Sequence, residues 1–284
     1  MDDSKFLIIG ANGQLGKALQ QKYPNAMTAD VDELDITDAE AINKYDWNSV
    51  TTILNAAGYT NVDGAESDEG RLAAWQVNAR AVANLAKAAI EHDLIFVHVS
   101  TEYVFDGSKS PHKEDEPFSP LSVYGASKAA GDIAAGFAPK HYVVRTSWLI
   151  GEGKNFVRTM LELGRAGTSL KVVSDQIGRL TFTTELVRAI SHLLSANSPY
   201  GIYNISNGGD PTSWADITRE IFKAAGFDLD VTDTTTREYF ASKPGVAPRP
   251  LNSTFDLSKI EATGFKPTDW RQDLREYIKK ENVG

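Results

Sequence analysis

The sequence KFLIIGANGQLG, residues 5–16, decides the fold. Its apolar half, residues 5–9, is typical of a buried parallel strand, and residues 17–22 after the turn are typical of a helix. The glycines between them suit a tight turn, a close approach of the backbone to a pyrophosphate, and close packing of the helix on the strand. The stretch therefore predicts a dinucleotide-binding βαβ unit, and a glycine turn without a ligand is the alternative.

The rest of the first half repeats this pattern of strand and helix. Strand-like apolar runs occupy residues 26–29, 50–54, 94–99 and 142–145, and an alanine-rich helical stretch occupies 70–92. Strands that alternate with helices at this spacing predict right-handed βαβ units. We therefore expect an α/β fold with a Rossmann-like, doubly wound parallel sheet.

The pattern loosens beyond Gly151. The later stretches are helix-like at 155–165, 184–196, 213–225 and 269–280, and strand-like at 170–173 and 201–205. We predict a dinucleotide-binding domain of residues 1–150, completed by 180–205. Residues 151–179 and 206–284 are expected to form a smaller substrate-binding lobe.

Composition excludes several classes of protein. The 284 residues carry a formal net charge of −9, which argues against nucleic acid as a partner. There is no cysteine, so disulfides and thiolate-bound metals are excluded. No apolar stretch approaches the ~18 residues of a membrane span, and the acidic segment 1–5 does not resemble a secretory signal. We expect a cytoplasmic protein with no membrane partner.

Four residues predict a reductase site. Tyr124 and Lys128 are four positions apart in a helix-like stretch, so they share one helix face. A fixed ammonium lowers the pKa of a neighbouring phenol, which suits that phenol to protonate a carbonyl oxygen near neutral pH. Ser100 and Thr101 end the preceding strand-like run, where open α/β sheets hold their ligands. An ordinary exposed helix is the alternative for the Tyr–Lys pair. Trp148, just past another strand end, suits either a pocket floor or the core.

Residues after two other strands suit a nicotinamide cofactor. Asp30 follows the second strand-like run about 20 residues beyond the first glycine, where a carboxylate accepts a hydrogen bond from a ribose 2′-hydroxyl. No arginine follows it, which favours NADH, whereas Lys17 is available for the 2′-phosphate of NADPH. The small residues Ala57 and Gly58 leave room for a flat ring against the backbone.

Six further motifs extend over nearly the whole chain: LDITD at 34–38, NAAGYTNVD at 55–63, STEYVFDG at 100–107, RTSW at 145–148, SDQ at 174–176 and RPLNS at 249–253. With them the chain resembles the extended short-chain dehydrogenase/reductases and, within these, the dTDP-4-dehydrorhamnose reductase family. The resemblance implies NADPH- or NADH-dependent reduction of the C4 ketone of a small nucleotide sugar, dTDP-4-dehydro-L-rhamnose.

The resemblance also implies roles for particular residues. Tyr124 would donate a proton, Lys128 would lower its pKa and anchor the cofactor ribose, and Thr101 would polarise the ketone. The other cofactor contacts would come from Gly10, Asn12, Gly13, Gln14, Leu15, Asp30, Asp35, Ile36, Ala57, Gly58 and Tyr59. The substrate would contact Thr101, Glu102, Tyr103, Trp148 and, at its diphosphate, the guanidinium fork of Arg249.

Two positions depart from the family pattern. Glu102 stands where the family usually has Asp and is one methylene longer, so the resemblance leaves the fine sugar specificity open. Some members hold Mg²⁺ at a dimer contact through a Glu after the glycine loop; the matching residue here is Ala18, although Glu185 retains one partner. We therefore predict no metal, and a monomer or weak homodimer.

Two other readings compete with simple reduction. A nucleotide-sugar 4,6-dehydratase or 4-epimerase shares the fold, but a dehydratase needs a second acid beside the threonine, and here Tyr103 follows Glu102. A non-catalytic regulatory subunit, such as that of methionine adenosyltransferase, also resembles this family. The presence of Thr101, Tyr124 and Lys128 together favours the reductase.

Overall fold

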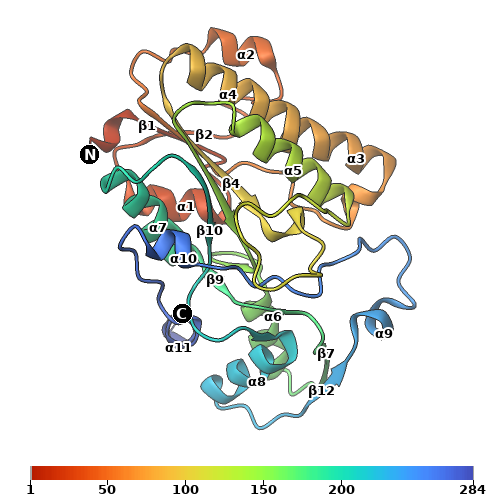
Figure 1. Ribbon diagram of the computed structural model, residues 1–284. Coiled ribbons are helices and arrows are strands. Elements are labelled where there is room, and N and C mark those ends of the chain that lie inside the picture. Colours follow the sequence, from red (N-terminus) through yellow and green to blue (C-terminus); the bar gives the residue numbers. More distant parts are fainter. Residues whose placement is uncertain (1, 284) are drawn as a thin grey trace.

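A six-stranded parallel sheet forms the centre of the protein (Figure 1). The computed structural model describes residues 2–283. The strands follow the order β10-β5-β4-β3-β1-β2, and each neighbouring pair is parallel. They are β1 (Phe6–Ile9), β2 (Met27–Ala29), β3 (Thr52–Asn55), β4 (Ile95–Thr101), β5 (His141–Thr146) and β10 (Gly201–Ile205). The predicted doubly wound parallel sheet is confirmed.

Helices cover both faces of the sheet because alternate strand residues point to opposite sides. Phe6 and Ile8 join a core under α1 (Gln14–Lys22) and α7 (Thr183–Ser195). Leu7 and Ile9 join a second core with α2 (Ala39–Lys44) and α4 (Ala81–Glu91). In Figure 1, α3 (Asp68–Trp75) and α5 (Val123–Ala135) lie on the same side as α2 and α4.

The predicted helix over 70–92 differs in its middle. A π-helical turn, η3 (Gln76–Arg80), separates α3 from α4. It holds the buried side chain of Asn78, whose Oδ1 accepts from Tyr59 N at 2.8 Å and whose Nδ2 donates to Ser127 Oγ at 3.0 Å. Helix α5 packs tightly against this turn, since a Cβ on Gly131 would lie 2.2 Å from Asn78 O. The turn therefore ties the α5 helix to the loop after β3.

The second lobe lies below the sheet in Figure 1. Its core joins Val157 and Leu161 of α6 to Ile217 of α8 and Trp270 of α11. The lobe's elements are α6 (Phe156–Arg165), α8 (Trp214–Ala225), α9 (Thr236–Phe240), α11 (Trp270–Val283), and the parallel pair β7 (Leu170–Val173) and β12 (Val231–Thr234). Shorter elements are α10 (Ser258–Glu261), η1 (Asp3–Lys5), η2 (Gly64–Glu66), η4 (Glu102–Val104), β6 (Leu149–Ile150), β8 (Ile177–Gly178), β9 (Thr181–Phe182) and β11 (Thr212–Ser213).

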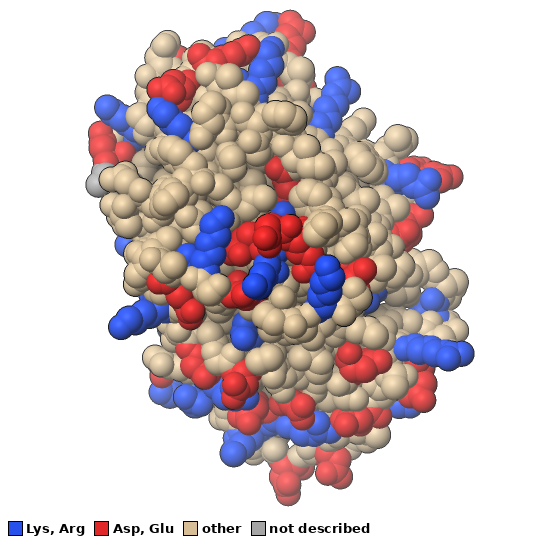
Figure 2. Space-filling model, in the orientation of Figure 1, with Lys and Arg blue, Asp and Glu red and all other residues tan. Residues whose placement is uncertain are grey.

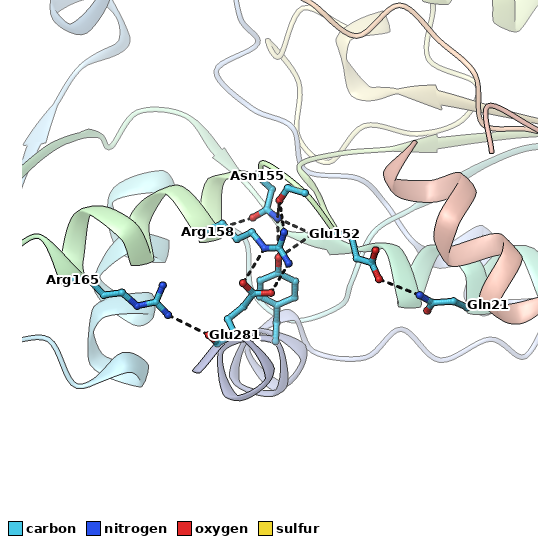
Figure 3. Close-up of polar contacts among 9 residues, drawn as sticks. Gln21, Glu152, Asn155, Arg158, Arg165 and Glu281 are labelled. Carbon is cyan, nitrogen blue, oxygen red and sulfur yellow. Dashed lines mark hydrogen bonds and ion pairs between the residues drawn. The ribbon is translucent and has the colours of Figure 1, made fainter. Parts of the chain in front are cut away.

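Polar contacts fasten the second lobe internally and to the first (Figure 3). Arg158 of α6 forms a bidentate ion pair with Glu281 of α11, at 2.8 and 2.9 Å. Gln21 of α1 donates to Glu152 Oε1 at 3.1 Å. The lobe therefore contacts the glycine-loop helix directly.

Candidate active site

Two glycines of the turn, Gly10 and Gly16, occupy positions where no side chain fits. Gly10 has φ +76°, and a Cβ there would lie 2.6 Å from Ala57 N. A Cβ on Gly16 would lie 2.2 Å from Gly10 O, so α1 sits directly against the end of β1. Gly13 precedes the first residue of α1 and carries no side-chain cap. The first amides of α1 are thus open to an anion such as a pyrophosphate.

Beside this turn lies a cavity of about 360 Å³. Its lining includes eight of the predicted cofactor residues: Gly10, Asn12, Gly13, Asp30, Asp35, Ile36, Ala57 and Gly58. Asp30 shapes the turn, since Oδ2 accepts from Asn12 N and Oδ1 from Val31 N, both at 2.9 Å. Lys17 lines a different cavity. The charged residues that line the cavity beside the glycine turn are therefore Asp30 and Asp35. The size and the glycine turn fit the adenosine half of a dinucleotide.

A second cavity of about 510 Å³ continues from the first. The two share Gly13, Ala56, Ala57 and Gly58 in their linings and therefore form one trough. The remaining predicted cofactor and substrate residues, apart from Arg249, line this second cavity: Gln14, Leu15, Tyr59, Thr101, Glu102, Tyr103, Tyr124, Lys128 and Trp148. The structure thus brings the predicted reactive groups to the end of the predicted cofactor site.

The strand β4 and the helix α5 position the three predicted catalytic groups. Thr101 is the last residue of β4, and its hydroxyl donates to Glu102 Oε2 at 2.8 Å. Tyr124 lies in the first turn of α5, which Ser122 caps through Gly125 N. One turn later, Lys128 Nζ donates to Val99 O at 2.7 Å. The three side chains are buried at the cavity wall.

The electrostatics of Tyr124 differ from the sequence-based expectation. Burial raises the pKa of the Tyr124 phenol, and the Glu102 carboxylate raises it further, whereas the hydrogen bond with Thr101 lowers it. Burial lowers the pKa of Lys128 to about 8, against the opposing effect of Asp132. The expected lowering of the Tyr124 pKa is therefore wrong, because desolvation within the protein raises this pKa instead.

A buried ion pair lies beneath the site. Asp132, one turn after Lys128 on α5, accepts from Arg145 Nε of β5 at 2.8 Å, and both side chains are almost fully buried. Arg145 also donates to Glu114 O at 3.0 Å, which anchors the loop before α5. This pair fixes α5 against the carboxyl end of β5, and with it the position of Lys128.

An aromatic pair forms another part of the wall of the second cavity. Trp148 has φ +45°, a conformation that is rare for a bulky residue and is concentrated at functional sites. Its ring stacks on Trp214 of α8 with centroids 3.8 Å apart, and both residues line the second cavity. Of the two interpretations of Trp148, the structure favours the pocket wall. Trp214 was not predicted from the sequence, because the sign of its role is its stacking on Trp148, which is distant in the sequence.

Arg249 lies outside that cavity. Its guanidinium donates to Asp63 Oδ2 at 2.9 Å and to Ala247 O at 2.7 Å. It lines a third cavity of about 270 Å³, which borders the second through Trp214. Arg249 is therefore adjacent to the predicted sugar site, and its ion-pair partner Asp63 was not singled out from the sequence.

The residues that resemble a family metal site do not fit a metal. Ala18 offers no ligand atom. Both carboxylate oxygens of Glu185 accept from Arg188, at 2.7 and 2.8 Å, and Oε1 also accepts from Thr268 N. Across residues 2–283 there is no group of three or more histidine and carboxylate side chains placed to hold a metal ion.

Acidic and basic side chains are interspersed over the face shown in Figure 2. Within the described part of the chain, no helix has the length and apolar character needed to cross a bilayer.

Comparison with known proteins identifies the family of the chain. The family described as RmlD substrate binding domain matches residues 4–283. A dTDP-4-dehydrorhamnose reductase of Aggregatibacter actinomycetemcomitans is 39% identical, over 96% of this chain and 97% of its own. The crystal structure of a Clostridium acetobutylicum dTDP-4-dehydrorhamnose reductase superposes with a TM-score of 0.91 at 38% identity, covering 98% of this chain and 99% of that one. The Bacillus anthracis reductase, solved in complex with NADP, has a TM-score of 0.88 at 34% identity, with 97% of each chain covered.

Proposed function

Because the chain belongs to the RmlD substrate-binding-domain family of dTDP-4-dehydrorhamnose reductases, we propose that it reduces the C4 ketone of dTDP-4-dehydro-L-rhamnose to dTDP-L-rhamnose with NAD(P)H. The observation that carries the proposal is the continuous trough. It joins the glycine turn at one end to Thr101, Tyr124 and Lys128 at the other.

The trough fits a nicotinamide dinucleotide, which when bound supplies the hydride for the ketone carbon. Gly13 and the first amides of α1 hold the pyrophosphate. Ala57 and Gly58 leave the backbone of the loop after β3 open to the ribose and ring. Lys128, held by Val99 O, orients the ribose hydroxyls with its remaining ammonium protons.

The proton for the ketone oxygen comes from Tyr124. Thr101 lines the same cavity, and its hydroxyl proton, donated to Glu102 Oε2 in the free protein, turns to the ketone oxygen when the substrate is bound, which stabilises the charge that develops there. Since the raised pKa keeps Tyr124 protonated at neutral pH, the acid is always in the form that the reaction needs. The buried wall of the cavity strengthens both interactions by excluding water.

The nucleotide part of the substrate is placed in the third cavity. That cavity adjoins the sugar site through Trp214 and presents aromatic side chains together with Arg249. A guanidinium matches diphosphate oxygens in geometry and charge, and the aromatic lining suits a flat base. Glu102, Tyr103 and Trp148 are then left to contact the sugar.

One assay tests this function. The purified chain is mixed with dTDP-4-dehydro-L-rhamnose and either NADPH or NADH, the absorbance of the reduced nicotinamide is followed, and the sugar product is identified by NMR. We expect loss of absorbance matched by formation of dTDP-L-rhamnose, and none with the Tyr124→Phe variant. A 4-epimerised or dehydrated product, or binding without turnover, would support the competing enzyme or non-catalytic readings instead.

The finer organisation is proposed on the same basis. We propose that residues 1–150 with 180–205 form the cofactor-binding domain and that 151–179 with 206–284 form the substrate lobe. The position of β10 in the main sheet supports this division. A cytoplasmic location, a monomeric or weakly dimeric state, and the absence of a nucleic-acid partner stay predictions.

A further inference from the structure

A fourth cavity, of about 390 Å³, lies between the two lobes. Its lining comes from α1, from the segment 150–153, from the start of α7, and from α6 and α11. It contains none of the proposed catalytic residues and shares only Gln14 with the second cavity. It is slightly larger than the cavity assigned to the adenosine half of the cofactor, so it has room for a small organic ligand.

The amino end of α7 opens into this cavity. The helix has 13 residues, and its N-cap residue, Phe182, makes no side-chain cap. Phe182, Thr183 and Thr184 all line the cavity. The first backbone amides of a helix have no intrahelical partners and carry partial positive charge, so this end of α7 favours an anion.

The Thr183 side chain is a second, independent sign of a ligand. It is only 6% exposed, it lines the cavity, and its hydroxyl has no hydrogen-bond partner among residues 2–283. A Cβ on Gly151 would lie 3.0 Å from Thr183 Oγ1, so the missing side chain of Gly151 leaves space directly beside this hydroxyl. A buried hydroxyl without a partner costs free energy, and a ligand in the cavity would supply that partner.

Gln14 presents another polar atom to the same space. Its Oε1 is buried and has no partner in the described part of the chain, and it lies 3.2 Å from the place of the Gly151 Cβ. Its Nε2 donates to Lys154 O at 3.1 Å, which fixes the orientation of the amide. An amide oxygen can only accept. A matching ligand therefore carries a hydrogen-bond donor, such as a hydroxyl, beside its anionic group.

Basic side chains complete the lining. Lys17 and Lys280 line the cavity, and neither side chain forms an ion pair with a residue from 2 to 283. The two carboxylates of the lining are already engaged (Figure 3): Glu281 by Arg158, at 2.8 and 2.9 Å, and Glu152 by an amide of α1, at 3.1 Å. With three basic and two acidic side chains, the lining has a formal charge of +1.

We propose that this cavity binds a small phosphate ester that also carries hydroxyl groups, as a sugar phosphate does. The three terminal oxygens of a phosphate accept from the helix amides, the Thr183 hydroxyl and an ammonium at once, which the two oxygens of a carboxylate do not. Gln14 Oε1 accepts from a hydroxyl of the ligand. The site lies outside the catalytic residues, so the inference does not depend on the reductase activity.

Isothermal titration with glucose 1-phosphate tests the proposal, with NADPH and dTDP-L-rhamnose present in excess to fill the trough. One molecule of glucose 1-phosphate should bind per chain, and glucose should not bind. Inorganic phosphate should bind at least ~10-fold more weakly, because it offers no sugar hydroxyl to Gln14. Absence of glucose 1-phosphate binding, or equal affinity for inorganic phosphate, would overturn the proposal.

Two variants locate the binding. Thr183→Val removes the hydroxyl with little change of shape and should raise the Kd of glucose 1-phosphate about 10-fold. Lys280→Glu should raise this Kd at least ~10-fold, and because Lys280 is exposed this variant reports even if Thr183→Val does not fold.

Each variant has a matched control. Thr181 is fully buried with an unpartnered hydroxyl but does not line this cavity, and Lys279 adjoins Lys280 but pairs with Glu276 at 2.7 Å. Thr181→Val and Lys279→Glu should keep the Kd within ~2-fold of wild type. Equal losses in variants and controls, or no loss in either variant, would refute the placement. The reductase assay is a separate measurement, and its failure would refute the proposed function while leaving this site standing.

Discussion

Replacing Gly125 by alanine tests whether the contact between α5 and η4 sets the catalytic geometry. Gly125 follows Tyr124, and a Cβ at this position would lie 2.2 Å from Tyr103 O. Ordinary contact begins at 3.4 Å, so the helix and the turn that follows Thr101 must separate by about 1 Å. Overpacking of this kind costs about 1–3 kcal/mol of folding free energy. Because Tyr124 and Thr101 lie on opposite sides of the contact, the separation should also lower kcat by about 10²-fold.

The assay pairs kcat for NAD(P)H oxidation with thermal unfolding. Gly136→Ala is the matched control, since it ends the same helix and a Cβ there would meet only the helix's own carbonyls, at 3.3 and 3.4 Å. Gly136→Ala should retain wild-type kcat and stability. Wild-type kcat and melting temperature in Gly125→Ala would refute the reasoning, because the clash is with backbone that cannot rotate away.

Four further predictions concern the same site. Tyr124→Phe should lower kcat by about 10²–10⁴-fold and leave the cofactor Kd nearly unchanged, as measured by fluorescence titration; normal turnover would rule out the proton donor. Lys128→Ala should weaken both cofactor affinity and kcat, and an unaltered NADH Kd would count against its ribose contact. Asp132→Asn leaves the buried Arg145 cation unpaired and should cost about 3–5 kcal/mol in urea unfolding. The exposed Lys140–Asp93 ion pair offers the control for this variant, because Asp93→Asn should cost less than ~1 kcal/mol. The pKa of Glu102 is about 7 in the folded protein, above its ordinary value of 4.5. At a pH between these two values the folded protein therefore keeps a proton on Glu102 that the unfolded chain has lost. The unfolding free energy of the wild-type chain, relative to that of Glu102→Gln, should thus fall by about 3 kcal/mol as the pH rises from 4.5 to about 7. A difference between the two proteins that does not change with pH would show that Glu102 is not buried as described.

The parts of the site that could be predicted from the sequence are those whose signals are local. The glycine turn, Asp30 and the Tyr124–Lys128 pair each lie within one turn or one strand end, so spacing alone places them. The capping of α2 by Asp38 and the end of α8 at Gly226 follow from the same short-range rules.

Features that depend on distant partners could not be predicted in this way. The π-helical turn forms around Asn78, whose partners lie on two other elements. The partnership of Trp148 with Trp214 requires the second lobe to fold against the first. The prediction of a lowered pKa for Tyr124 was wrong because Lys128, one turn away, is visible in the sequence and desolvation is not. Desolvation depends on the cavity wall that forms only on folding, and it raises this pKa.

The pairing of Arg249 with Asp63 has a consequence for how the substrate enters. On the proposed placement, an arriving diphosphate displaces a carboxylate from the guanidinium rather than meeting a bare cation. The affinity for the diphosphate then depends on the difference in free energy between the Arg249–diphosphate pair and the Arg249–Asp63 pair. Because added salt weakens both pairs, it should change this difference little. Asp63 accepts from Ala247 N through its other carboxylate oxygen, so the carboxylate that the diphosphate displaces is itself bound to the loop that leads to Arg249. Exchange of partners at the guanidinium is thus coupled to the position of that loop.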